Sequence, residues 1–169
     1  MAEDAFGEDV VDSVLDKADL ENDGAYTSVG NYSCAELMKV VEAFSEHSGL
    51  SPEVLQRKFG NWMHEHFAQN FPEFYKDKGG SFDMLEALDG EIHVEVRKLY
   101  PEAELPRFTT NRKSDNHLEM VYSSPRPLVG FCHGLIEACT ANFGETAEIE
   151  RGETEAEDNC TTFQIKVTS

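Results

Sequence analysis

The hydrophobic period of the sequence changes near residue 105, and this change limits the folds that the chain can adopt. Up to about residue 100, apolar residues recur every three or four positions, as on one face of an α-helix. From Arg107 they alternate with polar residues, which is the period of a half-buried β-strand. One apolar helical stretch, beginning at Pro127, interrupts these strands. The sequence therefore predicts an α+β fold, with a helical part at about 1–100 and an antiparallel sheet with one long helix at about 105–169.

Length and charge restrict the partners that we expect. At 169 residues, the chain is long enough for one domain with its own core, so we expect a single domain over 1–169. The formal net charge of −19 should repel nucleic acid and anionic lipid surfaces. No apolar run is long enough to span a bilayer, no signal-peptide pattern is present, and the four cysteines are scattered without a CxxC motif. We therefore expect a cytoplasmic protein with reduced thiols that binds neither nucleic acid nor membrane.

The motifs of common enzyme classes are missing from the sequence. We find no P-loop, no HExxH motif, no glycine-rich nucleotide loop and no Ser-His-Asp set. The sequence therefore predicts that the protein is not an enzyme.

A Tyr-x-Ser-x-Arg pattern stands between an apolar strand and the long apolar helix. Tyr122, Ser124 and Arg126 occupy alternate positions, so they point to the same side of an extended segment. Two hydroxyls and a rigid guanidinium group suit the binding of one or two carboxylates.

A lone histidine, His93, lies on a predicted helix that we expect to start at a Ser81 cap and to continue through Leu99. It stands at the border of the apolar stripe of this helix, and Asp89 lies four residues earlier on a neighbouring position. On spacing alone, a satisfied structural histidine is the more common role. A neutral imidazole in an apolar wall is also a good iron ligand, if an acceptor holds its other nitrogen. A carboxylate clamp together with a separate histidine is what a haem requires.

Together, these features resemble the haem nitric oxide/oxygen-binding (H-NOX) domain, from about Phe6 to the C-terminus. The resemblance rests on Tyr122, Ser124 and Arg126, on His93, on the Leu-Pro pair that contains Pro106, and on a helix that runs through Gly134-Leu135-Ile136. It implies a haem b (iron protoporphyrin IX) between the helical part and the sheet part. His93 would then ligate the iron, Tyr122, Ser124 and Arg126 would hold the propionates, and Pro106 would press on the porphyrin and bend it.

Two departures from the family pattern concern the chain ends. Phe6-Gly7-Glu8-Asp9 lies almost at the start, so the helix that normally precedes this segment is missing from the sequence. We expect the distal side to be more open, to be covered by another element, or to be covered by a molecule with which the chain pairs. Cys160 matches one position of a zinc site found in some relatives, but the other ligands are not in place, so the sequence leaves open whether zinc is bound.

The distal positions that the resemblance assigns are apolar. Phe131 stands where oxygen-binding relatives place a tyrosine, and the other distal positions are also without a donor: Met63, Phe67 and Leu135. Since bound dioxygen would lose its hydrogen bond, the resemblance implies a sensor of nitric oxide that also binds CO and discriminates against O2. His64 could reach the distal iron, but we expect it to point to solvent beside Glu65 and His66.

The resemblance also implies a signalling partner. Binding of nitric oxide would weaken the His93–iron bond, and a separate effector, such as a histidine kinase or a cyclic-di-GMP enzyme, would read the resulting shift. The alternative that the sequence leaves open is a haem-free or weakly haem-binding interaction module of the same fold.

Overall fold

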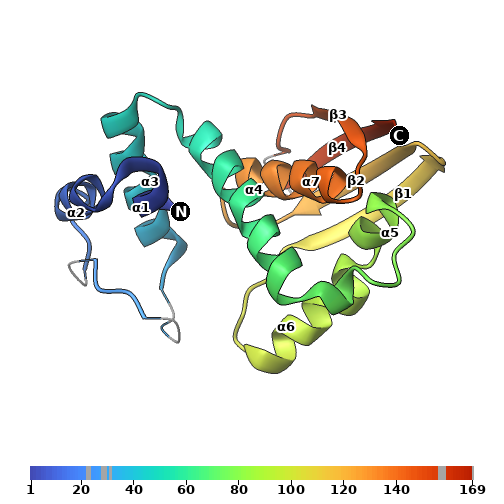
Figure 1. The fold of residues 1–169 in the computed structure, drawn as a ribbon, viewed down its shortest axis with the longest axis horizontal. Coiled ribbons are helices and arrows are strands. Elements are labelled where there is room, and N and C mark those ends of the chain that lie inside the picture. Colours follow the sequence, from blue (N-terminus) through green and yellow to red (C-terminus); the bar gives the residue numbers. More distant parts are fainter. Residues whose placement is uncertain (22–23, 28–29, 31, 156–158, 169) are drawn as a thin grey trace.

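The structure, a computed structural model, describes residues 1–21, 24–27, 30, 32–155 and 159–168. Within these residues, a cluster of helices lies at one end of the molecule and a sheet with its covering helices lies at the other (Figure 1). Helix α4 (Pro52–Asn70) runs between the two ends. The predicted α+β fold is confirmed.

The N-terminal helices are α1 (Ala2–Phe6), α2 (Glu8–Lys17) and α3 (Cys34–Ser48). Helices α1 and α2 are separated at Gly7, whose φ of 87° is a conformation that side-chain-bearing residues rarely adopt. Helix α3 ends at Gly49, which is also left-handed. Apolar side chains of these helices pack together with the first turn of α4, around the buried residues Val14, Phe44 and Leu55.

Helix α4 begins as the sequence predicts. The hydroxyl of Ser51 accepts a hydrogen bond from the Val54 N–H at 3.3 Å, and Pro52 occupies the first helical position. A short 3₁₀ turn, η1 (Pro72–Phe74), follows the helix. No helix within the described ranges is both long and apolar enough to cross a membrane.

The helix expected between Ser81 and Leu99 is not continuous, which corrects the prediction. It consists of α5 (Ser81–Glu86), a π-helical turn η2 (Leu88–Ile92) and α6 (His93–Leu99). The wide turn changes the phase of the side chains, so Leu99 leaves the apolar stripe and is 70% exposed. Ser81 is also not the cap, because its buried hydroxyl and its N–H both donate to the carboxylate of Glu145.

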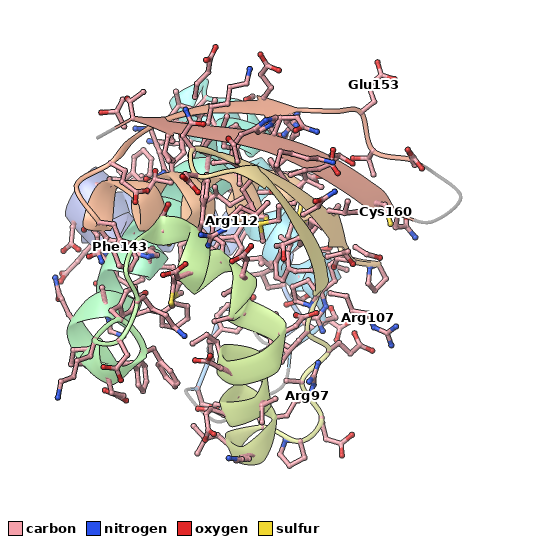
Figure 2. The ribbon with its side chains drawn as sticks, turned by 90° about the vertical axis from the view of Figure 1, so that its right-hand side faces the viewer. Arg97, Arg107, Arg112, Phe143, Glu153 and Cys160 are labelled. Atoms are coloured by element: carbon pink, nitrogen blue, oxygen red, sulfur yellow. The ribbon has the colours of Figure 1, made fainter. Side chains whose placement is uncertain are left out.

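The described strands form one antiparallel sheet in the order β1-β2-β4-β3. They are β1 (Arg107–Ser114), β2 (His117–Ser123), β3 (Thr146–Arg151) and β4 (Cys160–Thr168). Strands β1 and β2 form the predicted hairpin, in which Phe108 pairs with Tyr122. Arg112 of β1, labelled in Figure 2, binds the carboxylates of Asp83 and Glu86 on α5.

Helix α7 (Val129–Asn142) and α5 cover the inner face of the sheet. The core between them consists of buried apolar side chains from these elements, including Phe82, Leu85, Leu118, Met120, Cys132, Ile136, Cys139, Phe163 and Ile165. Helix α7 begins two residues later than the predicted start at Pro127.

Helices α4 and α7 cross with their backbones in contact. A Cβ atom on Gly134 would lie 2.0 Å from the carbonyl oxygen of Arg57, and one on Gly60 would lie 2.3 Å from the carbonyl oxygen of Phe131. Only glycine fits at these positions without a shift of the helices. The crossing therefore fixes Phe131 and Leu135 against α4.

Candidate functional site

The candidate site begins at His93, the first residue of α6, which is 9% exposed. Its Nδ1 lies 2.8 Å from Oδ1 of Asp89. Burial lowers the pKa of His93, although the Asp89 carboxylate opposes the shift. The imidazole is therefore neutral at pH 7, with Nδ1–H as the donor to Asp89.

The second ring nitrogen of His93, Nε2, makes no hydrogen bond within the part of the chain that the structure describes. Every fully buried polar side-chain atom in the same residues has a partner, so Nε2 must reach accessible space. A neutral imidazole with one nitrogen anchored and the other open is the arrangement of a metal-binding histidine.

Phe108 connects His93 to the Tyr-x-Ser-x-Arg segment. Its ring centroid lies 5.7 Å from the ring centroid of His93 and also 5.7 Å from that of Tyr122. The three rings therefore form one wall, which begins two residues after the half-buried Pro106. Sequence reasoning did not single out Phe108 as a site residue, although its position as an inward residue of the first strand was the available signal.

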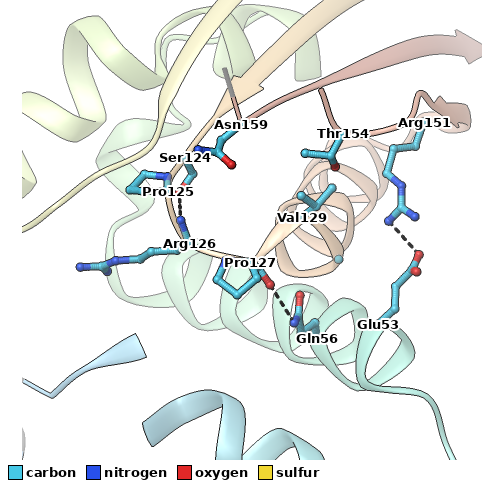
Figure 3. A pocket seen from close by; sticks show the side chains of 11 residues that line it. Glu53, Gln56, Ser124, Pro125, Arg126, Pro127, Val129, Arg151, Thr154 and Asn159 are labelled. Carbon is cyan, nitrogen blue, oxygen red and sulfur yellow. Dashed lines mark hydrogen bonds and ion pairs between the residues drawn. The ribbon is translucent and has the colours of Figure 1, made fainter. Parts of the chain in front are cut away.

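Tyr122 and Ser124 are both buried, Tyr122 in β2 and Ser124 directly after it. Burial raises the pKa of Tyr122, so its phenol is protonated and can donate. The Ser124 hydroxyl accepts from the Arg126 N–H at 3.1 Å, as Figure 3 shows. The predicted triad therefore lies at the end of β2, where Arg126 contacts the Ser124 hydroxyl through its backbone N–H.

The guanidinium of Arg126 binds an acidic side chain. Its Nη2 lies 2.9 Å from Oε2 of Glu104, and the side chain is directed away from the cavity of Figure 3. The Glu104 side chain is 72% exposed, so this ion pair is worth little and can be exchanged for another carboxylate at small cost.

The loop that carries the triad is held from two directions. Gln56 of α4 donates to the Pro127 carbonyl at 3.0 Å, and the Ser124 N–H donates to the Asn159 carbonyl at 3.3 Å. A cavity of about 360 Å³ lies beside this loop, and an ion pair between Glu53 and Arg151 closes its far side (Figure 3). The triad thus stands on a loop braced by α4 and by the start of β4.

The residues predicted for the distal side lie on α4 and α7. Phe131 packs against Phe59 at a centroid distance of 5.3 Å and lines an apolar cavity of about 300 Å³. The other lining residues come mainly from α1, α3 and α4, and they include Phe6, Val40, Phe44 and Leu55. Leu135 follows one turn after Phe131, whereas Met63 and Phe67 lie one turn apart on α4, where Phe67 is 42% exposed.

His64 does not point to solvent, which corrects the sequence prediction. It is 6% exposed, and its Nε2 lies 3.3 Å from the hydroxyl of Tyr75, with the two rings edge to face. Burial lowers the pKa of His64 to about 4. Its imidazole faces Tyr75, which directly follows η1. The Tyr75 hydroxyl therefore occupies Nε2, the nitrogen that would otherwise be open to bind iron.

The donor groups fit a haem: a neutral histidine with an open nitrogen, two buried hydroxyls, and an arginine whose ion pair with an exposed carboxylate can be exchanged. The described residues contain no group of three or more His, Cys, Asp and Glu side chains placed to hold a bare metal ion. The fold and these groups together are those of a haem-binding α+β sensor domain.

Comparisons with known proteins agree with this class. The haem-NO-binding family matches residues 1–151. The Fe(II) unliganded H-NOX protein from K. algicida is 30% identical, with a TM-score of 0.92 over 99% of this chain and 91% of that chain. The IWP-051-bound H-NOX from Shewanella woodyi in the Fe(II)CO state is 39% identical, with a TM-score of 0.80 over 97% and 87% of the two chains.

A third structure supports the fold alone. The H-NOX protein from S. oneidensis in the Fe(II)NO state is 22% identical, with a TM-score of 0.89 over 100% of this chain and 94% of that chain. A comparison with curated protein sequences gave no significant match. The chain belongs to the haem-NO-binding (H-NOX) family, whose members are haem-based gas-binding sensor domains rather than enzymes.

Proposed function

We propose that this protein is a sensor that binds nitric oxide at a ferrous haem b and reports to a separate partner protein. The observation that carries the proposal is His93: its imidazole is neutral, Nδ1 is held by Asp89, and Nε2 is open. The same wall of rings continues to the clamp residue Tyr122. When bound, the haem supplies a ferrous iron that takes up a gas molecule.

In this proposal the clamp residues hold the propionates. Arg126 releases the exposed Glu104 and pairs with a propionate carboxylate instead, which preserves one charge-assisted contact. Tyr122 and Ser124 supply hydroxyl donors from positions that are already fixed by burial. Pro106, directly before β1, would contact the macrocycle and would distort it, which would tune the chemistry of the iron.

The choice of gas follows from the side chains around Phe131. Phenylalanine donates no hydrogen bond, so bound O2 would lack its main stabilising contact. Met63, Phe67 and Leu135 add apolar surface and no donor. Nitric oxide and CO need no such donor, and relatives have been observed in the Fe(II)NO and Fe(II)CO states.

The remaining parts of the proposal concern context. Residues 1–169 form one sensor domain, and the effector is a separate cytoplasmic protein such as a histidine kinase or a cyclic-di-GMP enzyme. The exposed apolar side chains Leu99 and Tyr100 at the end of α6 favour a second candidate, a haem-free interaction module of the same fold. Haem uptake by the purified protein separates the two candidates.

The test of gas selectivity is a set of absorption spectra of the haem-loaded ferrous protein under nitric oxide, CO and O2. We expect the Soret band to shift with nitric oxide and CO and to stay unchanged in O2. The variant Phe131→Tyr introduces a donor at the distal side and should gain a spectrum of an O2 complex, whereas the control variant Phe143→Tyr, in the sheet-side core, should not. Stable O2 binding by the unmodified protein would overturn the proposal.

A further inference from the structure

Gln56 of α4 is a buried polar side chain that stands between two cavities. It is 7% exposed, and it lines both the cavity of about 360 Å³ beside the clamp loop (residues 124–128) and the cavity of about 300 Å³ at Phe131. We name these the polar cavity and the apolar cavity. Within the described part of the chain, no other residue lines both of them. Gln56 therefore belongs to the wall that separates the two cavities.

The two cavities differ in the chemistry of their walls. The polar cavity includes the exposed carboxylate of Glu53 and the guanidinium of Arg151, so it is in contact with solvent. Among the described residues that line the apolar cavity, Gln56 alone has a side chain with an amide, a hydroxyl or a charge. A water molecule needs several polar partners to be held in a cavity, so the apolar cavity stays dry. Gln56 thus separates a wet space from a dry one.

Two contacts of the Gln56 amide hold this wall closed. Its Nε2 donates to the Pro127 carbonyl at 3.0 Å, as Figure 3 shows, and to the sulfur of Met38 on α3 at 3.7 Å. Pro127 lines the polar cavity, whereas the next residue, Leu128, lines the apolar one. The bond therefore fastens α4 to the clamp loop at the point where this loop passes from one cavity to the other.

The oxygen of the same amide is turned toward the polar cavity. Both hydrogen bonds of the Gln56 side chain use Nε2, and every fully buried polar side-chain atom of the described residues has a partner, so Oε1 must reach accessible space. A Cβ atom on Gly130 would lie 3.1 Å from this oxygen, and Gly130 lines the polar cavity but not the apolar one. Solvent in the polar cavity can therefore reach Gln56 and stops there.

We propose that Gln56 is a gate through which a small gas molecule passes from the polar cavity into the apolar cavity. This inference rests on the proposed function, because it takes the apolar cavity at Phe131 as the distal side of the haem. The structure shows the closed position. Rotation of the Gln56 side chain breaks its bond to the Pro127 carbonyl and opens the wall. One neutral hydrogen bond gives about a fivefold preference for the closed position.

A competing route would enter the apolar cavity between the N-terminal helices. Leu37 of α3 lines this cavity and is 37% exposed, so it stands at a second mouth that needs no movement of Gln56. The substitution Leu37→Trp narrows that mouth and leaves the contacts of Gln56 in place. It therefore separates the two routes.

Two substitutions of Gln56 release the gate in different ways. Gln56→Met keeps the length of the side chain but removes the donor to Pro127, so the side chain still fills the wall and is no longer held. Gln56→Ala removes most of the side chain and leaves an opening. The matched control is Gln69→Met, which makes the same exchange at an exposed glutamine near the end of the same helix.

The first measurement uses the haem-free protein and methyl NMR under xenon pressure. Xenon occupies apolar cavities, so the methyl signals of Leu55 and Leu128 should shift, and that of Thr154 in the polar cavity should not. The exchange rate of xenon, obtained from the line widths, should rise about fivefold in Gln56→Met and stay unchanged in Gln69→Met and Leu37→Trp. An exchange rate that Gln56→Met leaves unchanged would overturn the gate, and a slower rate in Leu37→Trp would assign the entry to the N-terminal helices.

The second measurement uses the haem-loaded ferrous protein and follows CO association after flash photolysis. Association should be about fivefold faster in Gln56→Met, faster still in Gln56→Ala, and unchanged in Gln69→Met. A gate changes entry and exit by the same factor, so CO dissociation should rise equally and the affinity for CO should stay the same. A changed affinity with an unchanged association rate would show a structural effect on the haem site and would contradict the gate.

Failure of the gate and failure of the proposed function have different signatures. If the unmodified protein takes up no haem, the proposed function fails, while xenon exchange in Gln56→Met still decides whether Gln56 controls entry to the apolar cavity. If haem binds and Gln56→Met equals the unmodified protein in both xenon exchange and CO association, the gate fails and the sensor proposal stands.

Discussion

Replacing Gly134 by alanine should be among the most destabilising single substitutions in this protein. The added methyl group would lie 2.0 Å from the Arg57 carbonyl oxygen and 2.8 Å from its carbonyl carbon. Ordinary contact begins at 3.4 Å, so α7 must move away from α4 by more than one ångström. Both contacted atoms belong to the backbone, and therefore no side-chain rotation can relieve the overlap.

The magnitude follows from the place of Gly134 in the fold. Overpacking in a close-packed interior costs about 1–3 kcal/mol, and here the rigid backbones place the cost at about 3 kcal/mol. For a chain of this size, that loss corresponds to a fall in Tm of roughly 6–12 °C. Since Phe131 and Leu135 flank Gly134 on α7, the shift also moves the proposed distal side.

The assay is urea unfolding of the haem-free protein, followed by far-ultraviolet circular dichroism. The matched control is Gly90→Ala, where an added methyl group has no atom within 4 Å and φ is not left-handed. We expect the control to change the free energy of unfolding by less than about 1 kcal/mol, because alanine only adds helix propensity there. If Gly134→Ala unfolds within about 1 kcal/mol of the unmodified protein, the backbone contact between α4 and α7 is wrong.

Three further predictions concern buried and paired groups. Because burial lowers the pKa of His64 to about 4 in the folded protein, against about 6.5 unfolded, the unfolded chain binds the proton first as the pH falls. The free energy of unfolding should therefore fall by up to about 3 kcal/mol between pH 6.5 and pH 4, and by less if water that reaches the imidazole screens its charge. In His64→Leu, the urea midpoint should not show this part of the pH dependence. Burial also raises the pKa of the Cys132 and Cys139 thiols, the latter to about 12. A thiol reagent at pH 8 should therefore modify these two cysteines only after the protein unfolds. If peptide mapping finds them labelled in the native protein, they are not buried. Finally, Glu104→Gln removes the competing carboxylate from Arg126 and should slow haem transfer to an excess of acceptor protein by up to about fivefold. Arg126→Met removes the guanidinium and should speed the transfer more than about tenfold. Equal transfer rates in these two variants and in the unmodified protein would show that Arg126 does not hold the propionates.

The architecture could be predicted from the sequence because the hydrophobic period reports which faces are buried. The alternation from Phe108 onward placed the first two strands, and this local signal survives in their register. The caps at Ser51 and Pro52 were predictable because their signal is also local. The prediction that Tyr122, Ser124 and Arg126 share one side of an extended segment stays a prediction, because β2 ends at Ser123 and Arg126 contacts Ser124 through its backbone N–H.

Features that depend on distant contacts could not be predicted. The π-helical turn before His93 leaves no mark on the period of the residues around it, so one continuous helix was the natural expectation. His64 is buried because Tyr75 meets it from another segment, and no pattern on α4 signals this partner. Asp89 could be placed beside His93 from helical spacing, but its second bond, to Phe108, depends on how β1 returns to the turn.

The central claim is that His93 holds the iron of a bound haem, and the absorption spectrum of His93→Gly tests it most directly. The unmodified ferrous protein should show one Soret band that shifts on addition of nitric oxide, and the glycine variant should lose that band or show it altered. Added imidazole, which can occupy the space left by the side chain, should restore the original spectrum in the variant. If the variant gives the spectrum of the unmodified protein without imidazole, another residue ligates the iron and the account is wrong.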